Sequence, residues 1–448
     1  MATSSAKPRT RPAKAANGTS PAKPPRAGTI TPPEPELTPR ELIDRAVALR
    51  PLLREQAPKG EEMRRLPDET NAVFIAAGFY RTLQPRRFGG YEFDLQTFGK
   101  AMIEIARGDP AAAWVLAFTT GHTHVLAKYA ERAQVEVYGD DGDFRGPFVG
   151  AGVQGSSAKP VKGGYILNGV WDYASGCHGA THFFGTAQVR ENPDDPPKEM
   201  ITALFDRKDF EIVENWEMLG MRGSGSHRVI TNGLFVPQHR TNTRALGASD
   251  ERQQPGHGVH KNPFYAGPSI NVLMTEIAAV GIGTGYCALD AYEEIMRKRT
   301  AGLGPNRTSR MENADYQRYY GQAQAYLDTA RDALIGCTTD YMDACKLDVE
   351  EDIRFSADMS QRIMLVQQQC TRLAGEAADV LVRSAGSSAM KPGTLMERTW
   401  RDMTTLRTHI TLQNESSFAP AARVHFGLAP FPGDPRRVEG FGAPTTSK

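Results

Sequence analysis

The stretch from Tyr165 to His178, which reads YILNGVWDYASGCH, holds the residue types best suited to binding a flat ligand. Its apolar and aromatic residues indicate a strand, and Asn168-Gly169 is a typical hairpin signal. The strand ends in Ala174-Ser175-Gly176, three small residues that would let a planar ligand lie close to the backbone. From these residues alone, a β-hairpin with a buried aromatic ring and a tight exit is the simpler and the favoured interpretation.

Length and composition leave most functions open. The 448 residues carry 53 basic and 52 acidic side chains, so the net charge of +1 gives no argument for a nucleic-acid partner. Five cysteines occur in no CxxC pair and at no ligand-like spacing from histidine, which predicts reduced thiols in a cytoplasmic protein and no metal site. No apolar signal segment stands near the N-terminus, so no secretory signal is expected.

One segment could be either a membrane-spanning helix or a buried helix of a soluble bundle. Ile270 to Tyr292 is mostly apolar and is long enough to cross a bilayer. It carries Glu276 in the middle of the run together with several glycines. A carboxylate at that depth is costly, so a buried helix of a bundle is favoured over a membrane span.

The elements that must position the Tyr165–His178 stretch fall into three parts. Residues 1–37 are rich in Pro, Ala, Lys and Arg and are expected to form a disordered tail. Residues 38–143 are predicted to be helical, starting at the N-cap Thr38, with one helix that ends near Thr120 and another that begins near His124. Short alternating runs over residues 144–243 predict an antiparallel β-domain, a small barrel or sandwich.

Long helical periodicities dominate the rest of the chain. They predict a four-helix bundle domain over residues 244–425, followed by a tail over 426–448. The predicted helices are Ile270–Arg299, Tyr316–Lys346, Ile353–Ala385 and Thr394–Phe418. The fold class expected from the residues is therefore mainly α with a central β-domain.

Three sequence motifs, together with this order of domains, resemble those of a known protein family. Trp216 to Pro237, WEMLGMRGSGSHRVITNGLFVP, resembles the W-x-x-L-G-M-R-G-T-G-S-x-x-V…V-F-V-P motif of acyl-CoA dehydrogenases. Arg398 with Arg401-Asp402 resembles the R-x-x-R-D of that superfamily, and Leu381–Ala389 resembles its glycine-bearing loop near a neighbouring subunit's flavin. The resemblance covers about residues 38 to 425 and implies the acyl-CoA dehydrogenase fold: an N-terminal α-domain, a small β-domain and a C-terminal four-helix bundle.

Within that superfamily, the chain resembles the two-component flavin-dependent monooxygenases, such as the oxygenase component of 4-hydroxyphenylacetate hydroxylase. Dehydrogenases commonly carry a glutamate base about eight residues after the R-D pair, where this chain has Thr408-His409-Ile410-Thr411. Some dehydrogenases carry the base on another helix. An acyl-CoA dehydrogenase or oxidase with bound FAD therefore stays open as the alternative, with Glu276 as a candidate base.

The resemblance implies three catalytic residues. His409 matches one family histidine, and His122 matches a second, which follows a tryptophan, here Trp114, by eight residues. His124 competes with His122 for that position. Trp171-Asp-Tyr173-Ala-Ser175-Gly176 resembles the family's W-x-F-x-S-G, whose serine lies beside flavin N5.

The chemistry of the family gives these residues their expected roles. Reduced flavin and O2 form a C4a-hydroperoxide that survives only where bulk water is excluded. The resemblance implies that Ser175 holds the proton on N5 and that His409 supports oxygen transfer. It also implies that His122 activates the substrate, a task suited to an imidazole with a pKa near 7. The division of roles between the two histidines stays open.

The expected ligands and partners also follow from the resemblance. They are reduced flavin (FMNH2 or FADH2), O2, a flavin reductase and a small-molecule substrate, bound by a cytoplasmic homotetramer without a membrane or nucleic-acid partner. Arg299 and Thr300 lie in a segment that resembles an R-K-T-x-G phosphate-binding sequence, although a basic helix C-terminus is an equal interpretation. The candidate flavin-binding residues are Trp171, Tyr173, Ser175, Ser156, Ser157, Arg299 and Thr300. The choice of FMN or FAD, and of carbon, nitrogen or sulfur as the oxidised atom, stays open.

Overall fold

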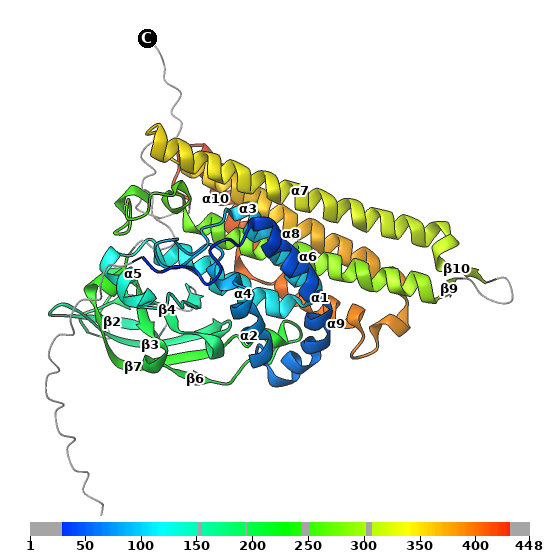
Figure 1. Ribbon diagram of the computed structural model, residues 1–448, viewed down its shortest axis with the longest axis horizontal. Helices are drawn as coiled ribbons and strands as arrows, with labels where there is room; N and C mark the ends of the chain where they lie inside the picture. The colour runs from blue at the N-terminus through cyan, green and yellow to red at the C-terminus, as the bar shows by residue number, and fades with distance from the viewer. Residues whose placement is uncertain (1–28, 151–154, 193–194, 244–250, 302–306, 431–448) are drawn as a thin grey trace, which may run out of the picture.

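The computed structural model describes residues 29–150, 155–192, 195–243, 251–301 and 307–430. Long helices form one side of the molecule, the β-domain lies on the other side, and shorter N-terminal helices lie between them (Figure 1). The helical core and the β-domain core are separate clusters of buried apolar side chains. This layout is the predicted one, mainly α with a central β-domain.

The N-terminal helices begin as their capping residues predict. Thr38 and Glu41 form a reciprocal capping box at the start of the first helix. The helices are α1 (Pro39–Met63), α2 (Asp68–Ala76), α3 (Leu95–Gly108), α4 (Pro110–Leu126) and α5 (Glu131–Tyr138). The predicted break after Thr120 is wrong, because α4 continues through Gly121. A Cβ at Gly121 would lie 1.7 Å from a carboxyl oxygen of Glu276, so this glycine provides a close helix contact and does not end the helix.

Part of the predicted N-terminal tail is ordered. Residues 1–28 lie outside the described residues. Beyond them, Ile30 pairs with Phe88, the Arg45 guanidinium lies 2.7 Å from the Glu34 carboxylate, and Leu37 is buried in the helical core. The predicted boundary at residue 37 is therefore wrong for residues 29–37. Residues 431–448 of the predicted C-terminal tail also lie outside the described residues.

The β-domain is a mixed sheet in the strand order β6-β7-β3-β2-β4-β5-β8, with β1 beside β4. Most pairs are antiparallel, as predicted, but β4 runs parallel to both β1 and β2. The strands are β1 (Phe148–Val149), β2 (Ser157–Val161), β3 (Gly164–Ala174), β4 (His182–Val189), β5 (Glu199–Asp206), β6 (Glu211–Val213), β7 (His227–Pro237) and β8 (Thr241–Asn242).

The predicted hairpin at Asn168-Gly169 is wrong. Strand β3 runs straight through both residues, with a register shift against β7 at that point. The Asn168 side chain accepts a hydrogen bond from the backbone N–H of Gly233, and a Cβ at Gly169 would collide with the Trp171 ring. The two residues therefore accommodate a bulge and a large neighbour, and β3 carries the chain to Ser175 as one long strand.

Within its described residues, the C-terminal domain contains three long α-helices and two short ones. They are α6 (Ser269–Lys298), α7 (Ala314–Glu350), α8 (Ala357–Ala385), α9 (Leu395–Leu406) and α10 (Asn414–His425). The predicted fourth helix, Thr394–Phe418, is wrong, because the chain breaks between α9 and α10 into a short 3-10 turn at Ile410–Leu412. His409 is the N-cap residue of that turn, so the break places the predicted catalytic histidine outside a regular helix.

Helix α6 is the central helix of the bundle. It is long and apolar enough to span a membrane, but 94% of its most apolar window is buried inside the protein. This confirms the preference for a buried bundle helix. At its C-terminal end, β9 (Thr300–Ala301) and β10 (Thr308–Ser309) form a small hairpin, which lies at the end of the long helices remote from the β-domain (Figure 1).

Candidate active site

One face of α4 forms an aromatic row at intervals of four residues. The rings of Trp114 and Phe118 stack with centroids 4.3 Å apart, and the His122 ring stands edge-on to Phe118 at 5.9 Å. His409 approaches from the break between α9 and α10 and stands edge-on to Trp114 at 5.5 Å and to Phe118 at 6.4 Å. The two predicted histidines, 287 residues apart in the sequence, therefore contact the same ring, Phe118.

Ser175 joins this row from the β-domain. The Trp114 indole Nε1–H donates a hydrogen bond of 3.0 Å to Ser175 Oγ, which also lies 2.7 Å from Ser226 Oγ. Gly176 follows with φ +74°, a left-handed conformation that favours glycine, and its N–H donates to the Ser224 carbonyl. The strand end is thus held between α4 and the loop before β7, so that His122, Ser175 and His409 all lie around Trp114 and Phe118.

A buried contact between domains positions this arrangement. The backbone N–H of Met221, in the Trp216–Pro237 motif, donates to Asp402 Oδ1 of α9 at 2.5 Å, and the N–H of Gly220 donates to Thr405 Oγ1 at 2.9 Å. Burial raises the pKa of Asp402 to about 8, so its carboxyl is neutral at pH 7. The R-D pair therefore docks the β-domain onto the helix whose end carries His409.

The two histidines are neutral and of opposite tautomer. Burial lowers the pKa of His122 and of His409 from 6.5 to about 4. His122 Nδ1–H donates to the Gly146 carbonyl at 2.8 Å, which leaves Nε2 as an acceptor. His409 Nδ1 accepts from the hydroxyl and the backbone N–H of Thr411, which leaves Nε2–H as a donor. The expected imidazole pKa near 7 is therefore wrong for this structure.

His124 does not compete with His122 for the site. It lies on the other side of α4, where Nδ1 lies 2.9 Å from Ser269 Oγ and Nε2 lies 3.0 Å from the Phe264 carbonyl. The Tyr341 hydroxyl lies 3.2 Å from the same Nε2. These contacts join α4 to the bundle, so His124 has a structural role.

The aromatic residues of β3 divide between surface and core. The Tyr173 side chain is 64% exposed, its φ is +66°, and its ring stands edge-on to Trp216 at 5.9 Å. Its bulged position turns the ring outward beside Ser175. Trp171 is fully buried between Phe183 and Phe205, and its indole N–H donates to a backbone carbonyl. The prediction that the Trp171 ring binds flavin is therefore wrong; the ring belongs to the β-domain core.

The other predicted flavin-binding residues lie away from Ser175. The Ser156 hydroxyl is buried and bonds to both backbone groups of Val170, and Ser157 pairs with Asn168, roughly 20 Å along the strand from Ser175. This use of the Ser156 hydroxyl contradicts the prediction that it binds flavin. Arg299 and Thr300 lie at the distal end of α6, so one chain does not bring them to Ser175 (Figure 1).

The distal end of α6 does join two of the predicted segments. Arg299 Nη1 donates to Ser388 Oγ at 2.5 Å. Ser388 belongs to the Leu381–Ala389 segment that resembles the loop near a neighbouring subunit's flavin. A basic residue and a hydroxyl are thus placed together, as a phosphate group requires. Their contact with a flavin stays a prediction.

The residues around Ser175 fit a flavin ring. A planar, partly apolar ring needs flat apolar surfaces and a hydrogen-bond donor for N5. The exposed Tyr173 ring, Leu219 (53% exposed) and Ile410 (61% exposed) are apolar surfaces that flank the site residues in the sequence. The Ser175 hydroxyl, which already accepts from Trp114, keeps its own proton available to donate.

Sequence reasoning missed two residues of the site. Phe118 lies between Trp114 and His122 at a spacing of four residues, a signal that was present in the helix pattern. Ser226 lies inside the Trp216–Pro237 motif, but nothing in the sequence shows that it bonds to Ser175. The structure is needed for that second contact, because 51 residues separate the two serines.

Comparisons with known proteins show the family of this chain. The family model described as acyl-CoA dehydrogenase, C-terminal domain, matches residues 275–414. HsaA, the oxygenase subunit of a flavin-dependent monooxygenase from Rhodococcus jostii (strain RHA1), is 30% identical over 387 residues, which cover 86% of this chain and 98% of HsaA. The oxygenase component of p-hydroxyphenylacetate 3-hydroxylase from Acinetobacter baumannii is 25% identical over 416 residues, which cover 89% of this chain and 92% of that protein. The crystal structure of 3-HSA hydroxylase from Rhodococcus sp. RHA1 matches with a TM-score of 0.78 and 30% identity, over 87% of this chain and 97% of that chain.

The fold and the site define a protein of the acyl-CoA dehydrogenase fold that lacks a glutamate base after its R-D pair. The chain belongs to the flavin-dependent monooxygenases, as the oxygenase component of a two-component system that uses reduced flavin and O2. The resemblance stated from the sequence is confirmed. The alternative, a dehydrogenase or oxidase with Glu276 as base, loses support, because Glu276 is fully buried against Gly121.

Proposed function

We propose that this enzyme hydroxylates a small phenolic substrate with reduced flavin supplied by a separate reductase, through a flavin C4a-hydroperoxide. The observation that carries the proposal is the convergence of Ser175, His122 and His409 on Trp114 and Phe118. Bound flavin would supply the activated oxygen. The residues of this chain would exclude water, orient the substrate and manage protons.

Each polar group has a role that matches its hydrogen bonds. The free Nε2 of His122 would accept the proton of a substrate hydroxyl and make the ring a better nucleophile. The Nε2–H of His409 would stabilise negative charge on the oxygen that is left behind after transfer. The Ser175 hydroxyl would donate to flavin N5. These roles follow from the tautomers, which assign the acceptor to His122 and the donor to His409.

The surroundings of His122 favour an aromatic substrate. The Phe148 and Phe184 rings lie 5.7 and 6.4 Å from the His122 ring, and the Phe118 ring lies 5.9 Å from it. Edge and face contacts of this kind suit a flat ring that carries one hydroxyl. The relatives named above include a hydroxylase of p-hydroxyphenylacetate, which has such a ring.

Partners and assembly complete the proposal. A flavin reductase would supply the reduced flavin, since oxygenase components depend on a separate source of it. We also propose a cytoplasmic homotetramer, in which Arg299 and Ser388 of one subunit would contact the flavin phosphate of another. This arrangement would explain why these residues lie far from Ser175 within one chain.

A reductase-coupled assay tests the proposal. The purified protein is mixed with a flavin reductase, NADH, flavin and a panel of phenols, indoles and amines, while O2 uptake and products are followed. We expect hydroxylated product only when reduced flavin, O2 and the oxygenase are all present. Bleaching of a tightly bound FAD by an acyl thioester without O2 would instead support the dehydrogenase alternative.

A further inference from the structure

Three serine hydroxyls form a continuous chain behind the active site. Ser175 Oγ lies 2.7 Å from Ser226 Oγ, and Ser226 Oγ lies 2.7 Å from Ser224 Oγ. Ser224 and Ser226 are buried, with 1% and 4% of their surfaces exposed. Each distance is that of a strong O–H···O hydrogen bond, so each serine can exchange a proton with the next.

The chain has two possible directions. The Trp114 indole can only donate, so it occupies one acceptor position of Ser175 and leaves the serine proton free to point elsewhere. In one arrangement Ser175 donates to Ser226 and Ser226 donates to Ser224. In the other, Ser224 donates to Ser226, Ser226 donates to Ser175, and Ser175 donates into the active site. A proton relay requires that every hydroxyl in the chain can reverse the direction in which it donates.

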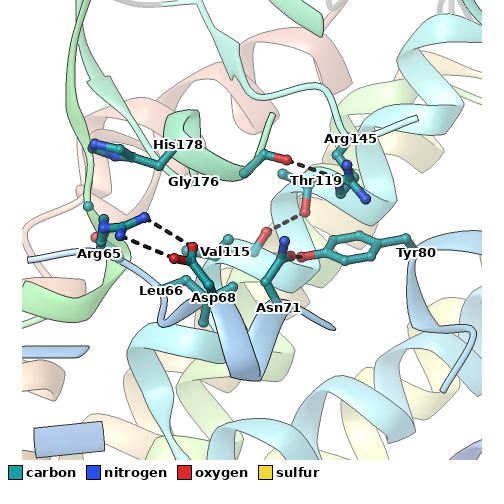
Figure 2. Close-up of a pocket in the computed structure, with 13 residues that line it drawn as sticks. Arg65, Leu66, Asp68, Asn71, Tyr80, Val115, Thr119, Arg145, Gly176 and His178 are labelled. Carbon is teal, nitrogen blue, oxygen red and sulfur yellow. Dashed lines mark hydrogen bonds and ion pairs between the residues drawn. The ribbon is translucent and has the colours of Figure 1, made fainter. Parts of the chain in front are cut away.

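Ser224, at the far end of the chain, belongs to the lining of a small cavity, which is drawn in Figure 2. The cavity has room for about 20 Å³, enough for a water molecule and too small for a flavin or an aromatic substrate. It lies behind Gly176, between α2, α4 and the loop that ends β3. Polar groups line part of it and can serve as the partners that a water needs. Its lining includes the polar residues Arg65, Asp68, His178 and Ser224 beside the apolar Leu66 and Val115.

The rim of the cavity is open to solvent through exposed polar side chains. The Asp68 side chain is 76% exposed and pairs with Arg65, and the His178 side chain is 21% exposed and lies 3.3 Å from Glu214. Figure 2 shows Arg65 pointing toward Asp68, and His178 across from them. A proton that reaches the cavity therefore has polar partners on the way to bulk water.

We propose that Ser175, Ser226 and Ser224 form a proton relay that connects the active-site face of Ser175 with the water-sized cavity behind Gly176. The inference rests on the proposed function, in which Ser175 would face flavin N5, and reduced flavin supplied by the reductase would already carry the N5 proton that must leave when the flavin returns to its oxidised form. The relay allows that proton to move while the flavin side of Ser175 stays closed to bulk water. Ser224 and Ser226 are thus positioning and proton-transfer residues, although neither contacts a reacting atom.

The step balances without a further reactant. When Ser175 Oγ receives a proton from the active site, its own proton passes to Ser226 Oγ. The Ser226 proton passes to Ser224 Oγ, and the Ser224 proton passes to water in the cavity. Each serine loses one O–H bond and gains one, one proton is moved in total, and no electron is transferred.

The first test uses the flavin-free protein, so it does not depend on activity. If the relay operates, the Trp114 indole proton exchanges with solvent through its acceptor, Ser175 Oγ, which the serine chain connects to the cavity. We expect Ser224→Ala to slow the exchange of the Trp114 indole proton into D2O at least about tenfold, as measured by NMR on 15N-tryptophan-labelled protein. Ser224→Thr, which keeps the hydroxyl, should restore the wild-type rate.

Trp171 is the matched control in the same spectrum. Its buried indole N–H donates to the Thr186 carbonyl, so the loss of a serine hydroxyl should leave its exchange rate unchanged. A slower rate at Trp171 as well would report a change in overall opening and would count against the relay. Ser226→Ala removes the central hydroxyl of the chain. It replaces Ser224→Ala in this test if Ser224→Ala does not fold. An unchanged Trp114 rate in a folded variant overturns the proposal.

The second test separates the relay from the proposed function. In wild-type enzyme with reduced flavin and O2, a plot of the flavin oxidation rate against the fraction of D2O should be curved. Such curvature indicates that several protons move in the same step. Ser224→Ala should lower the flavin oxidation rate and make the plot against the D2O fraction linear. A wild-type enzyme that shows the relay in NMR but forms no hydroxylated product would overturn the proposed function alone. Normal hydroxylation with identical curves in both proteins would overturn the relay alone.

Discussion

At the scale of single residues, burial decides the chemistry of this site. His122 and His409 are both neutral at pH 7, because desolvation lowers the pKa of each to about 4. In each ring, Nδ1 is bonded to a neighbour, to Gly146 in His122 and to Thr411 in His409. These bonds fix whether Nε2 accepts or donates a hydrogen bond. A neutral pair leaves one imidazole nitrogen free to accept from a substrate hydroxyl and one N–H free to donate to a developing anion, although the lowered pKa makes His122 a weaker base than a free imidazole.

This protonation state predicts the pH dependence of the reaction. The folded-state pKa lies below the ordinary value of 6.5, so the neutral imidazoles persist as the pH falls and become charged only near pH 4. We expect coupled hydroxylation to keep its rate from about pH 8 down to about pH 5.5. Stopped-flow measurements of product formation against pH test this. A loss of rate near pH 6.5 that disappears in His409→Asn would show that His409 titrates in the working range.

At the scale of elements, the contact between α9 and the β-domain is the most specific. Asp402 is buried and protonated at pH 7, and its carboxyl oxygen accepts the N–H of Met221, whose φ is +54°. The contact holds the loop before β7, and with it Ser226 and Ser175, against the helix that ends at His409. The site therefore depends on domain docking as much as on its own side chains.

Substitutions at Asp402 should separate hydrogen bonding from charge. Asp402→Ala leaves the Met221 N–H without its partner and should lower the free energy of unfolding by about 1–3 kcal/mol. Asp402→Asn keeps an acceptor oxygen and should cost little at pH 7. Because folding raises the pKa of Asp402 from 3.8 to about 8, wild-type stability should fall as the pH rises from about 4 to about 8 and should level off above that, and Asp402→Asn should remove that component. Urea denaturation at pH 7 and pH 9 measures both effects, and equal stability of the two variants at pH 7 would contradict the assigned contact.

The contact between α4 and α6 gives a second prediction. An alanine Cβ at position 121 would lie 1.7 Å from Glu276 Oε1, so Gly121→Ala should destabilise the protein by about 1–3 kcal/mol. Adding Glu276→Ala should recover part of that loss, because the two residues touch. Gly336→Ala in α7 is the control, since a Cβ there meets nothing within 4 Å and should be neutral or stabilising. Additive losses in the double variant would contradict the close contact.

These elements also show which structural features could be predicted from the sequence. Local signals were sufficient for the Thr38 cap and for the buried nature of α6, whereas the family resemblance pointed to His122 and His409. They failed at Asn168-Gly169, where pairing with β7 and the bulk of Trp171 decide the conformation. They failed again where α9 ends, because helical periodicity continues through His409 although the backbone does not. The Ser175–Ser226 contact and the lowered histidine pKa depend on tertiary burial, which no local pattern records.

At the scale of the whole molecule, the two parts of the proposed flavin site lie far apart within one chain. Ser175 lies at the β-domain, whereas Arg299 and Ser388 lie at the distal end of the long helices (Figure 1). The proposed homotetramer joins them, because a second subunit would bring its Arg299 to the flavin of the first. Light scattering should then give a mass of about four times the 49.1 kDa of one chain.

Arg299→Ala should weaken flavin binding in such a tetramer. Loss of a charge-assisted bond to phosphate should raise the Kd for reduced flavin about tenfold or more, as measured anaerobically by fluorescence. Arg297→Ala removes an exposed arginine that pairs with Glu293 on the same helix and should leave the Kd unchanged. Equal Kd values for both variants, in proteins that remain tetrameric, would contradict the phosphate role of Arg299.

The most direct test of the account is the fate of O2 at Ser175. Wild-type enzyme with reduced flavin, O2 and its phenolic substrate should convert most of the O2 into hydroxylated product. Ser175→Ala should still bind reduced flavin and consume O2, but should release H2O2 and lower the product yield per O2 at least about tenfold. The measurement is the ratio of product to H2O2 in a single turnover. An unchanged ratio in Ser175→Ala would contradict the assignment of this strand end as the flavin site.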